Sequence, residues 1–73
     1  MALLILEATG PKGEELAMKA GDELDIPVGF DPELESATFD SETVADEAEL
    51  QTIVFEALGR IDPDWQSQLR LAK

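Results

Sequence analysis

The middle of this chain carries almost all of its net negative charge. Residues 21–49 contain eleven acidic residues and no basic one, whereas the whole chain has 17 acids, five bases and a net charge of -12. Crowded like charges repel one another, and this repulsion opposes compaction. A fold that keeps such a local block bears a standing electrostatic cost, which favours the hypothesis that a cationic partner meets it.

The composition excludes several classes of chemistry. Cys and His are both missing from the 73 residues, so zinc sites built on these ligands, disulfide scaffolds, thiol chemistry and His-based triads are impossible. Direct electrostatic binding to nucleic acid is disfavoured, because phosphate binding depends on Lys and Arg and the chain has only five of them. We therefore expect one small domain over residues 1–73, with neither a metal nor a cofactor.

The apolar stretches are too short to cross a bilayer, which takes about 20 apolar residues. The first residues, Met1–Leu6, are apolar but lack a basic flank, and Glu7 ends the run. They do not resemble a secretory signal. The sequence predicts a cytoplasmic protein that makes no membrane contact.

The first half of the chain predicts a small sheet. The run Leu3–Ala8 is typical of a buried strand, and Thr9–Gly13 is typical of a turn. Residues 14–28 fit two structures. Two alternating apolar series separated by Gly21 favour a hairpin, whereas the good helix formers of residues 14–20, followed by that glycine, fit a helix that ends there.

The segment Glu15–Ile26 is similar to the E-L-x-x-x-x-G-D-x-L segment of SH3-like small barrels. This resemblance implies the hairpin and no binding residue, since the aromatic groove residues of those barrels have no counterpart here. Residues 31–40 are rich in acids, and we expect a loop there with one short strand over Ser36–Phe39.

The second half predicts two helices. Apolar residues from Leu50 to Ile61 recur at helical spacing, which indicates an amphipathic helix over about residues 42–59, capped by Asp40 or Ser41 and carrying a Glu56–Arg60 pair. Asp62-Pro63 is typical of a new helix start, and a short helix over about 63–72 would dock Trp65 into the core. The predicted class is α+β: a small antiparallel sheet of two or three strands packed against these helices.

The chain lacks the parts of a recognisable enzyme. Glu7 and Glu56 flank apolar patterns, but no second carboxylate is placed opposite either one for acid–base catalysis. The Gly10–Gly13 turn lacks the spacing of a phosphate-binding loop, and no segment fits an EF-hand loop. The stretch Phe39–Glu42 is similar to the D-S-[LM] prosthetic-group site of acyl carrier proteins, although Glu42 departs from that pattern, and Ser41 fits a cap or turn better.

We expect a non-enzymatic interaction module that presents carboxylates to a basic protein surface, in its sharpest form an inhibitor that imitates nucleic acid. The expected binding residues are Asp31, Glu33, Glu35, Asp40, Glu42, Asp46, Glu47 and Glu49. The module would be a monomer or a small homo-oligomer. Two alternatives stay open. The chain could be a structural subunit of a larger assembly that docks through an edge strand or a helix, or a halophilic protein whose acidity is only a solvation adaptation to high salt.

Overall fold

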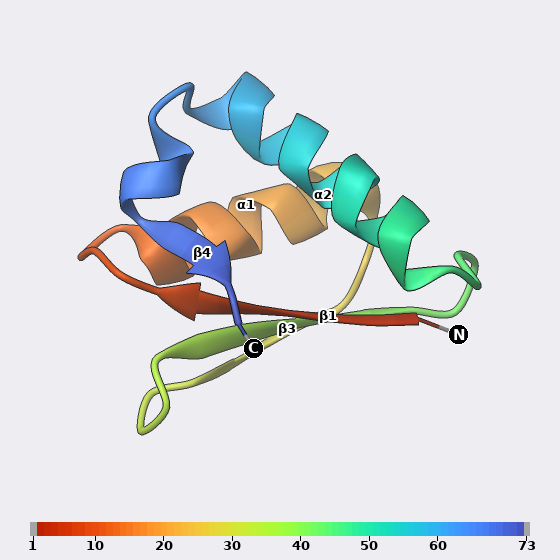
Figure 1. Cartoon of the computed structure of the whole chain (residues 1–73), viewed down its shortest axis with the longest axis horizontal. Helices are drawn as coiled ribbons and strands as arrows, with labels where there is room; N and C mark the ends of the chain where they lie inside the picture. The colour runs from red at the N-terminus through yellow and green to blue at the C-terminus, as the bar shows by residue number, and fades with distance from the viewer. Residues whose placement is uncertain (1, 73) are drawn as a thin grey trace.

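Two α-helices lie together on one face of a four-stranded antiparallel sheet in the computed structural model, which describes residues 2–72 (Figure 1). In chain order the elements are β1 (Ala2–Ala8), α1 (Gly13–Leu24), β2 (Val28–Asp31), β3 (Ser36–Ser41), α2 (Glu47–Ile61), the 3-10 turn η1 (Trp65–Ser67) and β4 (Leu69–Leu71). The predicted α+β class is confirmed, but the sheet has four strands rather than two or three.

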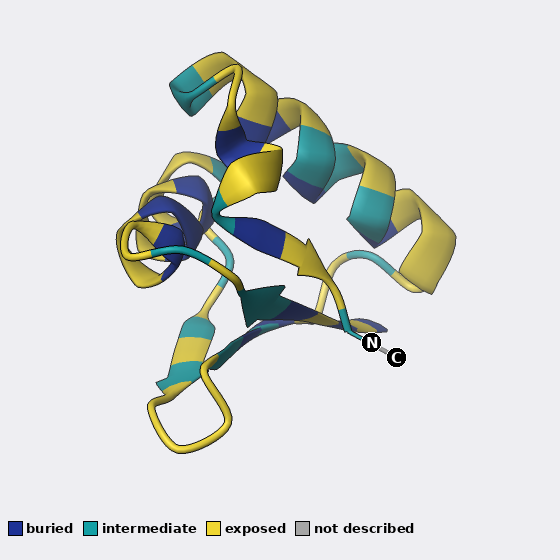
Figure 2. Cartoon of the chain, turned by 60° about the vertical axis from the view of Figure 1, so that its left-hand side comes forward, coloured by how far each residue is buried: buried dark blue, intermediate teal, exposed yellow. Residues whose placement is uncertain are grey.

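The strands lie in the order β2-β3-β1-β4, so each helix connects two strands that are not neighbours. With the element order β-α-β-β-α-β, this is the ferredoxin-like, or split βαβ, arrangement. Such a topology hosts many unrelated functions, so it does not by itself indicate one. It does leave the sheet face opposite the helices uncovered, and we call this surface the bare face (Figure 2).

Strand β1 shows why the sheet has two unlike faces. Leu4 and Leu6 are buried under the helices, whereas Leu3 and Ile5 are 47% and 45% exposed on the bare face. Side chains alternate between the faces of a strand, so this pattern follows directly from the pleat. The strand predicted over Leu3–Ala8 is confirmed, but it is buried on one face only.

The hairpin expected over residues 14–28 is wrong: Gly13–Leu24 form α1, the alternative that the local helix propensity supported. Leu16, Ala17, Ala20 and Gly21 are buried on one side of this helix. Met18, which completes the apparent alternation, is exposed. The likeness to SH3-like barrels therefore does not extend to the structure.

A β-hairpin replaces the loop expected over residues 31–40. Strand β3 runs to Ser41, beyond the predicted Ser36–Phe39, and pairs with both β2 and β1. Ala37 and Phe39 alternate with polar residues and are completely buried. The acids of this segment lie on the other face or in the connecting turn, so its high charge did not prevent a strand.

Helix α2 has the predicted type and apolar stripe, but it begins at Glu47, later than residue 42, and ends at Ile61. Asp46, not Asp40 or Ser41, is its N-cap: the Asp46 carboxylate accepts a hydrogen bond of 3.0 Å from the backbone N–H of Ala48. At the other end of the helix, Arg60 forms an ion pair with Glu23 of α1 at 2.7 Å, not the predicted pair with Glu56.

The helix predicted over residues 63–72 is wrong. Only η1 is helical there, and the following residues form β4, which pairs with Leu6–Ala8 of β1. A short isolated helix is marginal in water. The same residues are stabilised as a strand by backbone hydrogen bonds to the free edge of β1. Trp65 nevertheless docks as predicted: it is 7% exposed, and its ring centroid lies 4.8 Å from that of Phe55.

Candidate functional site

The eight predicted binding residues are all exposed, but they fall into two groups. The hairpin carboxylates are Asp31, Glu33 and Glu35, and the β3–α2 carboxylates are Asp40, Glu42, Asp46, Glu47 and Glu49. The groups lie at opposite ends of β3, a strand of six residues that spans roughly 17 Å at about 3.3 Å per residue. The fold thus does not bring the eight together into one patch.

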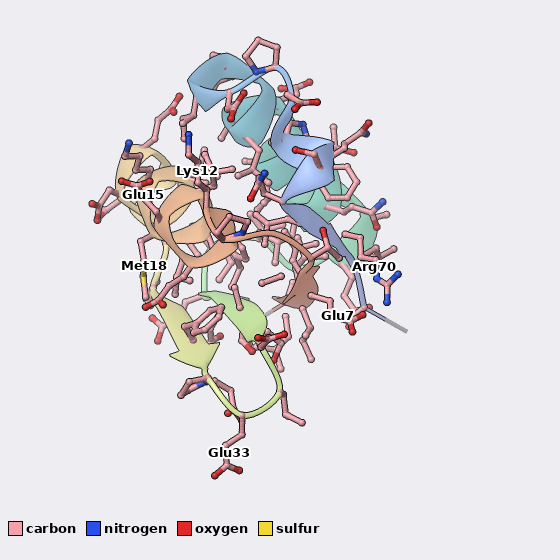
Figure 3. The ribbon with its side chains drawn as sticks, turned by 90° about the vertical axis from the view of Figure 1, so that its left-hand side faces the viewer. Glu7, Lys12, Glu15, Met18, Glu33 and Arg70 are labelled. Carbon is pink, nitrogen blue, oxygen red and sulfur yellow. The ribbon has the colours of Figure 1, made fainter. Side chains whose placement is uncertain are left out.

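Two of the hairpin carboxylates belong to residues that also shape the turn. The Asp31 side chain accepts hydrogen bonds from the backbone N–H groups of Glu33 and Leu34, at 2.9 and 3.4 Å. Glu35 has a left-handed backbone with φ of 51°, and its carbonyl accepts a bond from Ala8 at 2.6 Å. Only Glu33 projects from the tip without such a role (Figure 3).

The β3–α2 carboxylates occur from the end of β3 to the first turn of α2. Glu47 and Glu49 lie in its first turn, where the positive end of the helix dipole favours negative charge. Asp40 is on the bare face, directly opposite Leu3 of β1. Glu42 lies in the loop before the helix, although the helix predicted over about residues 42–59 would have included it.

None of these eight carboxylates forms an ion pair within residues 2–72. The three ion pairs of this region are Lys19–Glu15 at 3.7 Å, Arg60–Glu23 at 2.7 Å and Arg70–Glu7 at 3.1 Å. All three lie on exposed side chains, where such pairs contribute little to stability. The eight carboxylates therefore keep their charge free for a cation from outside this region.

A groove that no sequence pattern predicts lies beside the β3–α2 carboxylates. It has a volume of about 580 Å³ and opens between the edge of β1 and the first turns of α2. We call it the β1–α2 groove; its lining residues are Leu3, Leu4, Ile5, Glu47, Ala48, Gln51, Leu71 and Ala72. Three of its lining residues, Leu3, Ile5 and Leu71, are among the five large apolar residues exposed within residues 2–72. The side chains of Leu3 and Ile5 lie on the bare face, and that of Leu71 lies on the helix side.

A second hollow, of about 480 Å³, lies at the hairpin end of the sheet. Phe30, Pro11 and Pro32 contribute its apolar surface, and Glu14 and Glu35 contribute carboxylates. The backbone N–H groups of Thr9 and Gly10 donate to the carbonyl of Gln68 at 2.8 and 3.3 Å, and that of Lys12 donates to the Gln68 side chain at 2.9 Å. The Gly10–Gly13 turn is thus used to close the fold.

Glu7, a candidate acid for catalysis, and Ser41, a candidate site for a prosthetic group, both have contacts that stabilise the fold. Glu7 pairs with Arg70 across β1 and β4. Ser41 is 1% exposed and accepts a hydrogen bond of 3.0 Å from the N–H of Val44, so its hydroxyl is not presented for attachment of a prosthetic group. Within the described part of the chain, no three acidic side chains come close enough together to hold a metal ion.

Neither helix of residues 2–72 has the length and apolar character that a membrane span requires. Comparison with protein-family models, with curated proteins and with solved structures yielded no match.

Proposed function

We propose that this chain is a non-enzymatic interaction module that presents the β3–α2 carboxylates to a basic surface of a partner protein. The observation that carries the proposal is the exposure of these five side chains together with the lack of any ion pair to them within residues 2–72. Charges of this kind act mainly by steering encounter and raising the association rate.

The local placement of the charge favours binding over simple solvation. Solubility is served equally well by acids scattered over the whole surface, but here five carboxylates occur between Asp40 and Glu49. One of them, Asp40, lies directly opposite the exposed Leu3, and Ile5 is exposed on the same face. Protein–protein interfaces typically have a more apolar centre and a polar rim.

The sharper form of the proposal is an inhibitor that occupies a nucleic-acid-binding surface. Duplex DNA has about one phosphate charge per 1.7 Å of its axis, so a Lys- and Arg-rich groove is adapted to closely spaced anions. The β3–α2 carboxylates supply five anions within ten residues, from the end of β3 to the first turn of α2. In this form, the module and duplex DNA compete for one partner site.

The experiment compares capture of basic proteins by two variants with the same net charge. One variant neutralises the β3–α2 carboxylates (Asp40→Asn, Glu42→Gln, Asp46→Asn, Glu47→Gln and Glu49→Gln). The control neutralises five acids elsewhere (Glu14→Gln, Asp22→Asn, Glu33→Gln, Glu56→Gln and Asp64→Asn). Each is immobilised beside the unmodified protein, loaded with native lysate at low salt and eluted with a salt gradient.

We expect the unmodified protein and the control to retain the same partner and to release it as salt rises. The first variant should bind that partner at least about tenfold more weakly, since rim charges govern encounter. Retention that is independent of salt, or equal retention by all three proteins, would rule the proposal out.

A further inference from the structure

Strand β4 covers less than half of the outer edge of β1. Strand β1 has seven residues, but β4 pairs only with Leu6, Glu7 and Ala8. One further hydrogen bond, from the N–H of Ala72 to the carbonyl of Ile5 at 3.1 Å, extends this contact. The edge next to Leu3 has no strand beside it within residues 2–72, and this part of the edge forms one wall of the β1–α2 groove.

The backbone groups that face this open edge can be identified. In an antiparallel sheet, successive residues direct their N–H and C=O groups to opposite sides of the strand. Ala8 donates to Glu35 on the β3 side, and Ile5 accepts from Ala72 on the β4 side. Leu3 has the same parity as Ile5, so its N–H and C=O point into the open edge.

The side chains around the edge define what fits there. On the helix side, Leu71, which is 39% exposed, and Ala48 offer an apolar surface. On the bare face, Leu3 is paired in register with the exposed Asp40. Glu47 adds a second carboxylate at the rim of the groove. A strand that alternates apolar and basic residues would match both sides at once.

We propose that the β1–α2 groove takes up an extended segment of the basic partner, which adds to the sheet as a further strand beside Leu3. This inference rests on the proposed function and specifies the structure that the partner presents. Backbone hydrogen bonds would supply affinity, and the alternate side chains would supply specificity, as in other cases of strand addition. A second copy of this chain is a poor occupant, because two molecules of net charge -12 repel each other.

The test uses a defined probe, the hexapeptide acetyl-Lys-Val-Lys-Val-Lys-Val-amide, with its Glu-Val counterpart as the charge control. Hydrogen exchange at single amides is followed by NMR in the full-length protein, with and without peptide. The amide of Leu3 should exchange at least about tenfold more slowly when the peptide is saturating, because it gains a hydrogen bond. The amide of Leu4, which points toward β3, provides the internal reference and should not change.

Two N-methylated peptides test the register. The added strand is taken to run antiparallel to β1, as β4 does, so the residue opposite Leu3 forms a hydrogen-bonded pair with it and shares the bare face; this residue should be a Lys of the probe. Methylation of the three Lys nitrogens should weaken binding by about fivefold or more, as expected for loss of a net backbone hydrogen bond. Methylation of the three Val nitrogens should leave binding unchanged.

A matched pair of protein variants tests the charge. Asp40→Asn, which removes the carboxylate on the same face as the Lys side chains, should weaken binding of the probe, whereas Glu33→Gln, at the distant hairpin tip (Figure 3), should not. Binding that leaves Leu3 exchange unchanged would overturn strand addition while leaving the basic-partner function intact. No binding of the probe would also overturn it. Slower Leu3 exchange at rising protein concentration without peptide would identify a second copy as the occupant, contrary to the proposal.

Discussion

Leu3 of β1 lies directly opposite Asp40 of β3, and both side chains are exposed on the bare face of the sheet. An apolar residue and a carboxylate are thus held side by side where no helix covers them. Leu3 joins the β1–α2 groove to the β3–α2 carboxylates, because it also lines the groove. The proposed docking site therefore has an apolar part and an acidic part that meet at this pair.

Because Leu3 is exposed and Leu4 is buried, substitutions at the two positions should differ sharply in their effect on the free energy of unfolding. Leu3→Ser should change the free energy of unfolding by less than about 1 kcal/mol, as is usual for surface substitutions. Leu4→Ala should lower it by about 2–5 kcal/mol, because it leaves a cavity under the helices. Urea unfolding of the two variants measures the difference. Equal destabilisation would mean that something covers the bare face in the isolated protein.

Two glycines predict opposite responses to alanine. At Gly21, the new Cβ would lie 2.3 Å from Cγ2 of Val28 and 2.9 Å from the carbonyl oxygen of Ile26. Gly21→Ala should therefore be destabilising by about 1–3 kcal/mol, in the range for overpacking. At Gly59, within α2, the nearest atom is Nε1 of Trp65 at 3.9 Å, so Gly59→Ala should add up to about 1 kcal/mol of helix stability. Thermal unfolding of both variants checks the packing of α1 against β2; a tolerated Gly21→Ala would contradict it.

The cap of α2 separates structural from binding roles among the acids. Asp46→Ala should reduce stability by about 1 kcal/mol, because it removes the acceptor for the Ala48 N–H. Asp46→Asn keeps a capping side chain while it removes the charge, so it should retain most of the stability and still weaken partner binding. Chemical denaturation and partner affinity, measured on both variants, distinguish the two effects. Equal loss of stability in the Asn and Ala variants would show that charge, not the cap, is what matters.

Salt should stabilise the isolated protein, but only over a limited range. Its exposed carboxylates repel one another, and the Debye length falls from about 30 Å at 0.01 M to about 8 Å at 0.15 M salt. The free energy of unfolding should therefore rise across this interval and then change little up to molar KCl. A continued rise toward molar KCl would favour the halophilic alternative instead.

Local sequence patterns predict best those elements that form with little help from distant parts of the chain. The α2 stripe from Leu50 to Ile61 could be predicted, because its helical spacing outweighs the β-favouring run Thr52–Phe55. The docking of Trp65 could be predicted from its large apolar ring. Residues 14–20 were harder, since alternation through Met18 imitates a strand while every residue there favours a helix. Strand β4 could not be predicted, because three residues become a strand only through the free edge of β1 far away in sequence.

The charge pattern predicts which acidic residues are exposed, but not how the fold arranges them. High charge in residues 31–49 correctly indicated exposed side chains. Their division into two groups depends on β3, whose strand pairing sets them at opposite ends. The β1–α2 groove depends on where β4 stops, which no local pattern encodes.

The most direct test of the central claim is the affinity of the purified partner as a function of NaCl, for the unmodified protein and for the variant with neutralised β3–α2 carboxylates. The account predicts that affinity falls steeply with salt for the unmodified protein, and that the variant binds more weakly with a clearly shallower salt dependence. An affinity that salt does not change, or the same dependence in both proteins, would contradict the claim that these carboxylates are the docking surface.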